Sequence, residues 1–260
     1  MGWLRDKWDA WRVRRHALPD GLWLAVTRRL SVLAGLSATE RARLRTLATL
    51  FLADKALSGA GGMVLTPEIE VTIAAQACLP VLRLGLGWYD DWHEVIVYPD
   101  SFVVEHAEVD DTGLVHERRR VLGGEAWGRG PVILSWADAR PEAPGHGEGS
   151  NVIIHEFAHK LDMRNGEANG MPPLHRGMRR EDWTAAFTDA WNRLHERLAR
   201  HERTRIDPYA AESPAEFFAV LSEHFFAAPW ILAERCPAVY EQLRLFYRQD
   251  PLARLGAGIA

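Results

Sequence analysis

The sequence has little of what secreted, membrane-spanning and nucleic-acid-binding proteins depend on. Its 260 residues include two cysteines, Cys78 and Cys236, and neither belongs to a Cys-x-x-Cys pair, so we expect no disulfide framework and a reducing compartment. No apolar run is long enough to cross a bilayer, and the N-terminus lacks the uninterrupted apolar core of a signal peptide. A formal net charge of -4 provides no basic footprint for nucleic acid. These absences predict a cytoplasmic protein that does not bind nucleic acid directly.

What is present is typical of a well-packed globular protein, with 47% hydrophobic residues and eleven tryptophans. Near the N-terminus, Trp3, Leu4, Trp8 and Trp11 form an apolar stripe beside basic residues. Such a stripe could lie on a membrane surface or pack against the rest of the protein. We favour packing and expect no membrane partner.

The order of helix and strand patterns predicts an α+β fold that is mostly helical. Ser37 and Glu40 have the spacing of a capping box, and Thr66 followed by Pro67 begins a further helix. Short β-branched runs at 95–98, 102–104 and 132–134 predict a small sheet, with turns at 110–113 and at Gly123–Gly124. We therefore expect one domain over 1–260, with a helical part at about 1–87, a sheet at about 88–136 and a helical catalytic part at about 150–255.

The most informative segment is 151–162, which reads Asn-Val-Ile-Ile-His-Glu-Phe-Ala-His-Lys-Leu-Asp. In a helix, His155 and His159 lie on the same face one turn apart, where two neutral imidazoles can bind one Zn²⁺ ion. Glu156 then lies beside the metal. The apolar residues around this triplet predict a buried helix, in which unpaired polar groups would be costly. We favour a metal site over a solvated or core-satisfied histidine pair, and we expect one zinc ion per chain and Ser150 as the helix N-cap.

Two histidines need a third protein ligand, and Glu216 at the start of a largely apolar helix is the best candidate. One alternative is that Glu216 completes a capping box with Ser213. Another is that Asp162 is the ligand, or that it orients a ligand imidazole. Glu223, seven residues after Glu216 on the same face, is a candidate to support the site.

Two further segments could serve catalysis. Tyr209 precedes Glu216 on an irregular segment, where its hydroxyl could stabilise developing negative charge or its ring could simply pack at a helix start. The strand at 132–134 could offer its edge to an extended peptide, since main-chain pairing holds a substrate without requiring a particular side chain.

Several longer motifs resemble one family. They are H-E-F-A-H-K-L-D-x-R-N-G, G-P-V-I-L-S-W before it, C-L-P-V-L-R-L-G-L near Cys78, and Y-A-A-E-S-P-A-E-F-F-A-V-L-S-E-H-F-F after it. From about 37 to 255 the chain resembles the Mlc titration factor A family of zinc peptidases, which is similar to the gluzincins and, in its active site, to anthrax lethal factor. The resemblance implies that His155, His159 and Glu216 bind zinc.

By the same resemblance, the chain has a zincin-like metalloprotease fold, and Glu156 is the catalytic base and Tyr209 assists the transition state. Glu156 would take the proton of a zinc-activated water that attacks the peptide carbonyl, and would return it to the leaving amine. The implied activity is a weak, cytoplasmic aminopeptidase activity on peptide or aminoacyl substrates, together with binding and inactivation of the glucose repressor Mlc. The alternative is a regulatory protein that titrates a repressor, in which zinc is mainly structural.

Overall fold

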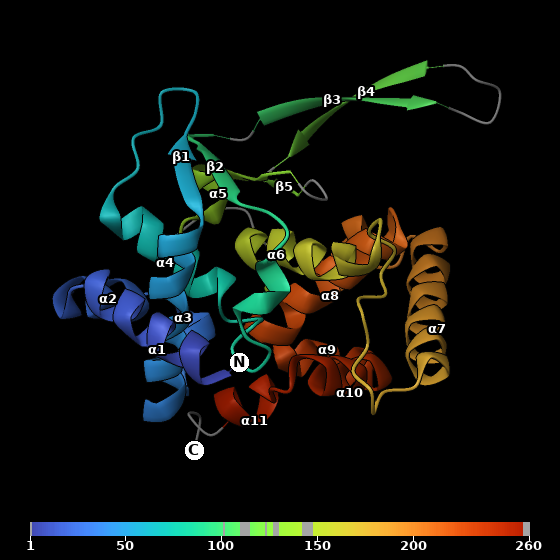
Figure 1. Cartoon of the computed structure of the whole chain (residues 1–260). Coiled ribbons are helices and arrows are strands. Elements are labelled where there is room, and N and C mark those ends of the chain that lie inside the picture. The colour runs from blue at the N-terminus through green and yellow to red at the C-terminus, as the bar shows by residue number, and fades with distance from the viewer. Residues whose placement is uncertain are drawn as a thin grey trace.

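The structure is a computed structural model that describes residues 2–100, 102–109, 115–122, 124–126, 130–141 and 148–256. Helices make up most of it (Figure 1). The α-helices are α1 (Gly2–Arg15), α2 (Asp20–Thr27), α3 (Ala38–Asp54), α4 (Pro67–Ala77), α5 (Trp136–Ala139), α6 (Val152–Asp162), α7 (Arg180–Ala199), α8 (Pro214–Ala227), α9 (Pro229–Arg235), α10 (Pro237–Tyr247) and α11 (Pro251–Gly256). Short 3₁₀ helices are η1 (Ser31–Leu33), η2 (Leu86–Tyr89), η3 (Met163–Asn165) and η4 (Pro208–Ala211).

Local sequence chemistry explains where many of these helices begin. The capping box of Ser37 and Glu40 opens α3, and the Thr66 side chain accepts from the backbone of α4. Helices α4, α8, α9, α10 and α11 each begin at a proline, whose missing N–H costs nothing in the first turn. The helix starts predicted at Ser37 and at Thr66–Pro67 are therefore confirmed.

The sheet is small and mixed, as the sequence predicts. Its strands are β1 (Ala56–Gly59), β2 (Glu94–Tyr98), β3 (Phe102–Val109), β4 (Val115–Leu122), β5 (Gly124–Ala126) and β6 (Val132–Ser135). Four of them form one sheet in the order β1-β2-β6-β5, in which β1, β2 and β6 are parallel and β5 is antiparallel to β6. Strands β3 and β4 form a separate antiparallel pair that extends away from the helices (Figure 1). The turn expected at 110–113 lies outside the described residues, as does Gly123.

The sequence analysis missed one strand and was wrong about the edge of another. Strand β1 was not predicted, because its four residues are at most partly buried and carry no alternating apolar pattern. The strand at 132–134 does not offer an edge, because β6 is paired with β2 on one side and with β5 on the other. Among the described strands, the edge next to β6 belongs to β5.

A cluster of four buried aromatic rings joins the N-terminal helices to α6. Phe51 of α3 and Phe157 of α6 pack against Tyr89 and Trp92, with ring centroids 5.4 to 6.4 Å apart and mostly edge-to-face. All four side chains are at most 1% exposed. This packing fixes the face of α6 that points away from its histidines. The expected division of one domain into three parts stays a prediction.

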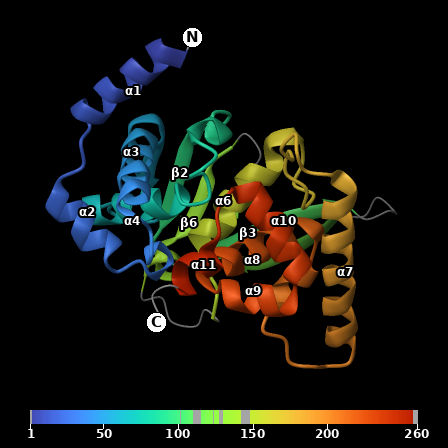
Figure 2. The same cartoon turned by 90° about the horizontal axis from the view of Figure 1, so that it is seen from below.

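Helix α1 differs from the rest, because it lies on the outside of the molecule, near α3 (Figure 2). Trp8 and Trp11 are 58% and 43% exposed, so the packing expected for this stripe does not extend to them. Their rings stack on each other at 4.9 Å instead, and Arg12 pairs with Asp54 of α3. In the described part of the chain, no helix is both long enough and apolar enough to cross a membrane.

Candidate metal site

Helix α6 places two histidines on one buried face. The Asn151 side chain caps the helix by accepting from the N–H of Ile154 at 2.9 Å. Every residue from Ile153 to Asp162 is buried, so this helix lies inside the protein as its apolar composition predicts. One turn apart, the Nε2 atoms of His155 and His159 lie 3.1 Å from each other.

Helix α8 supplies two carboxylates to the same imidazole. Glu216 Oε2 lies 3.0 Å from Nε2 of His155 and 3.4 Å from Nε2 of His159. Glu223, two turns further along α8, lies with Oε1 2.7 Å from Nδ1 of His155. The carboxylate that orients a histidine here is thus Glu223, and no such contact to a histidine is made by Asp162 in the described structure.

Glu223 is itself held in place. Its Oε2 atom accepts from the Asn151 N–H at 2.5 Å and from the Ser150 hydroxyl at 3.1 Å. The Asn151 side chain also donates to Gln76 of α4 at 2.6 Å. The expectation that Ser150 caps α6 was wrong, because Asn151 takes that position and Ser150 binds Glu223. Three helices therefore meet at the start of α6 through hydrogen bonds that fix the ring of His155.

These contacts leave a place for a cation. When His155 is neutral and its Nδ1–H donates to Glu223, the lone pair on its Nε2 points toward Glu216 and His159. A lone pair, a carboxylate and a second imidazole within 3.4 Å of one another repel unless a proton or a metal ion lies between them. The three residues could hold a metal ion together. Two imidazoles and one carboxylate are a donor set found in catalytic zinc sites, and Zn–ligand bonds of about 2.0–2.1 Å at tetrahedral angles separate ligands by about 3.3 Å.

The pKa shifts of the cluster also favour a positive charge at this place. Burial lowers the pKa of His155, but the hydrogen bonds to Glu216 and Glu223 outweigh burial and keep it well above its usual value. Burial raises the pKa of Glu216 and Glu223, yet hydrogen bonds from the histidines hold the pKa of Glu216 well below, and that of Glu223 below, the usual carboxyl value. The carboxylates therefore stay ionised, and they would stabilise a cation bound beside them.

Glu156 is the remaining polar group at this face. It is 4% exposed, and burial raises its pKa to about 7. Its Oε2 atom has no hydrogen-bond partner among the described residues. A buried carboxyl oxygen next to a candidate metal site, with no hydrogen-bond partner among the described residues, could accept a proton from a water.

Strand β5 closes over Glu156, which the sequence did not indicate. A Cβ built on Gly124 would lie 2.5 Å from Oε1 and 2.6 Å from Cγ of Glu156. Only a glycine leaves room there for the carboxylate in its present position. The Gly123–Gly124 pair was interpreted as a hairpin turn. The contact of Gly124 with α6 joins segments more than thirty residues apart, so no local sequence pattern indicates it.

Asp162 and Glu216 have separate tasks. Asp162 Oδ2 accepts from the N–H groups of Asn169 and Gly170 at 2.8 and 2.7 Å, so it holds the loop that follows α6. The backbone N–H of Glu216 donates to the Ser213 hydroxyl at 3.2 Å, while its carboxylate faces the histidines. The capping box of Ser213 and Glu216 is therefore half formed, and it leaves the Glu216 carboxylate at the histidines. Asp162, the alternative ligand, lies outside the cluster that could hold a metal.

Tyr209 lies at the border of the site. It belongs to η4, where the Asp207 side chain accepts from its N–H at 2.9 Å. Its ring centroid is 6.0 Å from that of His155, and the residue is half-buried. The structure thus places all five predicted site residues on α6, η4 and the first turn of α8.

Comparison with known proteins agrees with this arrangement. Residues 4–248 match the family model described as glucose-regulated metallo-peptidase M90. A Mlc titration factor A from Klebsiella pneumoniae subsp. pneumoniae is 45% identical over 230 residues, which cover 86% of this chain and 85% of that protein. Proteins of the same name from Salmonella arizonae and Escherichia coli are 44% and 42% identical, and cover 95% and 96% of this chain and 98% and 94% of their own lengths.

The match begins at residue 4, so the similarity reaches further toward the N-terminus than the motifs from about residue 37 indicate. It spans the segments that carry both histidines and Glu216. The chain therefore belongs to the M90 family of metallopeptidases.

Proposed function

We propose that this protein is a zinc-dependent peptidase of the aminopeptidase type. The observation that carries the proposal is the set of Nε2 atoms of His155 and His159 and Oε2 of Glu216, all within 3.4 Å of one another. A zinc ion bound there would supply Lewis acidity, which lowers the pKa of a water and polarises a carbonyl. Zinc fits better than magnesium or calcium, because those ions prefer sites made only of oxygen.

The residues of the chain then divide the work. Glu223 holds His155 in the tautomer and orientation that direct Nε2 to the metal. Glu156 accepts the proton of the attacking water at Oε2 and delivers it to the leaving amine. Tyr209 donates a hydrogen bond to the negative charge that develops on the carbonyl oxygen.

For substrate binding, we propose β5 rather than β6. In the described structure β5 pairs only with β6, so its other edge is available to an extended peptide. Gly124 of β5 lies directly over Glu156, so a peptide paired along β5 would pass the general base. Peptide and aminoacyl substrates suit this arrangement, because main-chain pairing demands no particular side chain.

A second candidate function is binding of the repressor Mlc. It is supported by the names of relatives that are 42–45% identical over most of the chain. We propose a cytoplasmic location for both functions, supported by two buried cysteines that remain unpaired.

The substitution Glu156→Gln tests the proposed catalytic function. The amide cannot accept a proton, so hydrolysis of alanine p-nitroanilide should fall by about 100-fold to 10,000-fold, while elemental analysis still finds one zinc per chain. Glu196→Gln on the exposed side of α7 is the matched control and should match the parent. Undiminished turnover by the Glu156 variant would contradict the mechanism.

The N-acetylated substrate tests the aminopeptidase specificity alone, because its cleavage at the same rate as the free substrate would contradict that specificity. Mlc binding that survives Glu156→Gln would separate the two functions.

Gly124→Ala tests the contact between β5 and the general base. The atoms nearest to the added methyl group would be Cγ, Cδ and Oε1 of Glu156, none of them a backbone atom, so we expect the Glu156 side chain to move and the fold to tolerate the change. We expect kcat to fall by at least about tenfold, since misplacement by about 1 Å can cost about 100-fold, with zinc content and thermal midpoint near those of the parent. Gly177→Ala is the control, because a Cβ there meets nothing within 4 Å. If Gly124→Ala turns over like Gly177→Ala, β5 does not position Glu156.

Tyr209→Phe distinguishes a catalytic tyrosine from a packing one. Loss of a hydrogen bond made only in the transition state should lower kcat and kcat/KM together by about 100-fold to 1,000-fold, with KM and zinc content nearly unchanged. Tyr240→Phe serves as the structural comparison, because its hydroxyl donates to Asp250 at 2.7 Å and its loss should cost about 1 kcal/mol of stability without changing kcat. If Tyr209→Phe behaves like Tyr240→Phe and loses stability but not kcat, Tyr209 has a packing role.

A further inference from the structure

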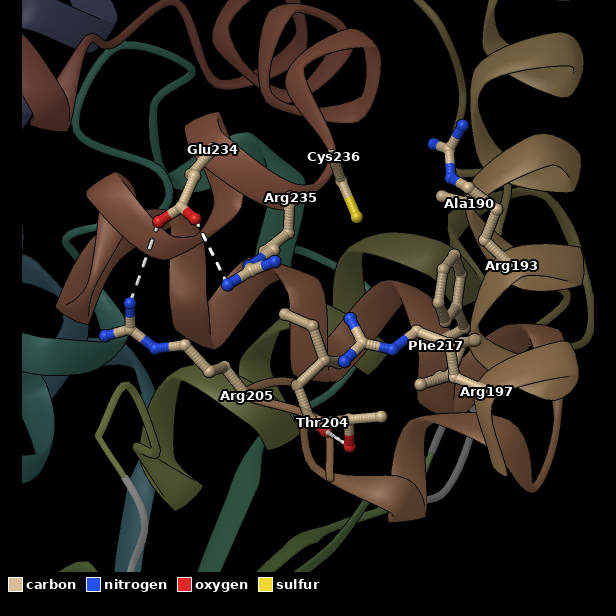
Figure 3. A pocket seen from close by; sticks show the side chains of 11 residues that line it. Ala190, Arg193, Arg197, Thr204, Arg205, Phe217, Glu234, Arg235 and Cys236 are labelled. Atoms are coloured by element: carbon tan, nitrogen blue, oxygen red, sulfur yellow. Dashed lines mark hydrogen bonds and ion pairs between the residues drawn. The ribbon is translucent and has the colours of Figure 1, made fainter. Parts of the chain in front are cut away.

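A cavity lies between α7, α8, the end of α9 and the segment before η4 (Figure 3). Its volume is about 230 Å³. The wall is made of Ala190, Arg193, Leu194, Arg197, Thr204, Arg205, Ile206, Phe217, Glu234, Arg235 and Cys236. None of these residues belongs to the candidate metal site, although Phe217 directly follows Glu216 in α8.

The wall combines an apolar part with a cationic part. Leu194, Ile206, Phe217 and Cys236 are each at most 8% exposed and form the apolar part. The polar part contains four guanidinium groups, which come from α7, from the segment before η4 and from α9. A cavity built this way is complementary to a molecule with an apolar body and an anionic head.

Basic side chains outnumber acidic ones on the wall itself. Four arginines and one glutamate line the cavity, and further acidic side chains pair with the arginines from outside it. Glu234 lies between Arg205 and Arg235 and forms ion pairs with them at 3.7 and 3.2 Å (Figure 3). These side chains are 41–57% exposed.

The other acidic partners do not line the cavity. Arg197 pairs with Glu202 at 3.2 Å and Arg205 with Glu148 at 2.6 Å, and Arg193 pairs with Asp189. The side chains in these pairs are 37–57% exposed, and exposed pairs of this kind contribute little to stability. Arg197 also donates to the Arg203 carbonyl at 2.7 Å. An incoming anion would therefore compete mainly with exposed ion pairs for these guanidinium groups.

We propose that this cavity is a binding site for a small organic anion, whose carboxylate or phosphate is bound by Arg197, Arg205 and Arg235 and whose apolar part packs on Leu194, Ile206 and Phe217. The cavity volume limits the ligand to roughly the size of an aryl or short alkyl acid. The proposal does not depend on the metal or on peptidase activity.

Isothermal titration calorimetry on the intact protein tests the proposal, with 4-phenylbutyrate as the probe. We expect one binding site per chain, and binding of the neutral amide 4-phenylbutyramide at least about tenfold weaker because it loses the charge-assisted hydrogen bonds. Inorganic phosphate should also bind at least about tenfold more weakly, because it has no apolar part. Equal affinity for the acid and the amide would overturn the proposal.

Three variants place the site. Arg197→Gln should weaken 4-phenylbutyrate binding by about tenfold, and Glu234→Gln should strengthen it several-fold, because a competing carboxylate is removed. Arg179→Gln is the control, since Arg179 forms a similar exposed pair with Glu181 at 3.6 Å but does not line the cavity. Thermal midpoints of all variants verify folding. Unchanged affinity in both Arg197→Gln and Glu234→Gln would place the bound anion elsewhere and overturn the assignment.

Discussion

The site depends on one interaction, the clamping of the His155 imidazole between two carboxylates of α8. Glu223 binds Nδ1 at 2.7 Å and Glu216 lies 3.0 Å from Nε2, so the ring is fixed in position and in tautomer. The three groups are largely buried, where unpaired charges would cost several kcal/mol each. A cation bound between His155, His159 and Glu216 would satisfy these charges, and the packing of α6 on α8 brings the three residues together.

The parts of this arrangement that follow from local sequence could be predicted. His155 and His159 share a face because helix geometry places residues four apart together. Glu216 could be chosen because an anion was needed and its helix was otherwise apolar. The capping of α3 and α4 depends on residues three positions apart, and it was found for the same reason.

The parts that depend on distant segments could not be predicted. Gly124 is needed because β5 crosses over Glu156, and a glycine pair in a sequence indicates a turn rather than a close approach to a helix. Ser150 and Asn151 are both good N-caps by residue type. The Ser150 hydroxyl donates to Glu223, more than seventy residues away, and Asn151 caps the helix. Strand β1 joins the sheet by parallel pairing with β2, a contact that its own four residues do not indicate.

Removal and return of zinc test the central claim, that the buried cluster requires a cation. The protein is stripped with a chelator, and its thermal midpoint is measured before and after zinc is added, for the parent and for Glu216→Gln. At a free zinc concentration of about 100 Kd, binding should stabilise the parent by about 2.7 kcal/mol and raise its midpoint by about 5–10 °C, with a smaller rise in the variant. A parent protein that melts at the same temperature with and without zinc would contradict the account.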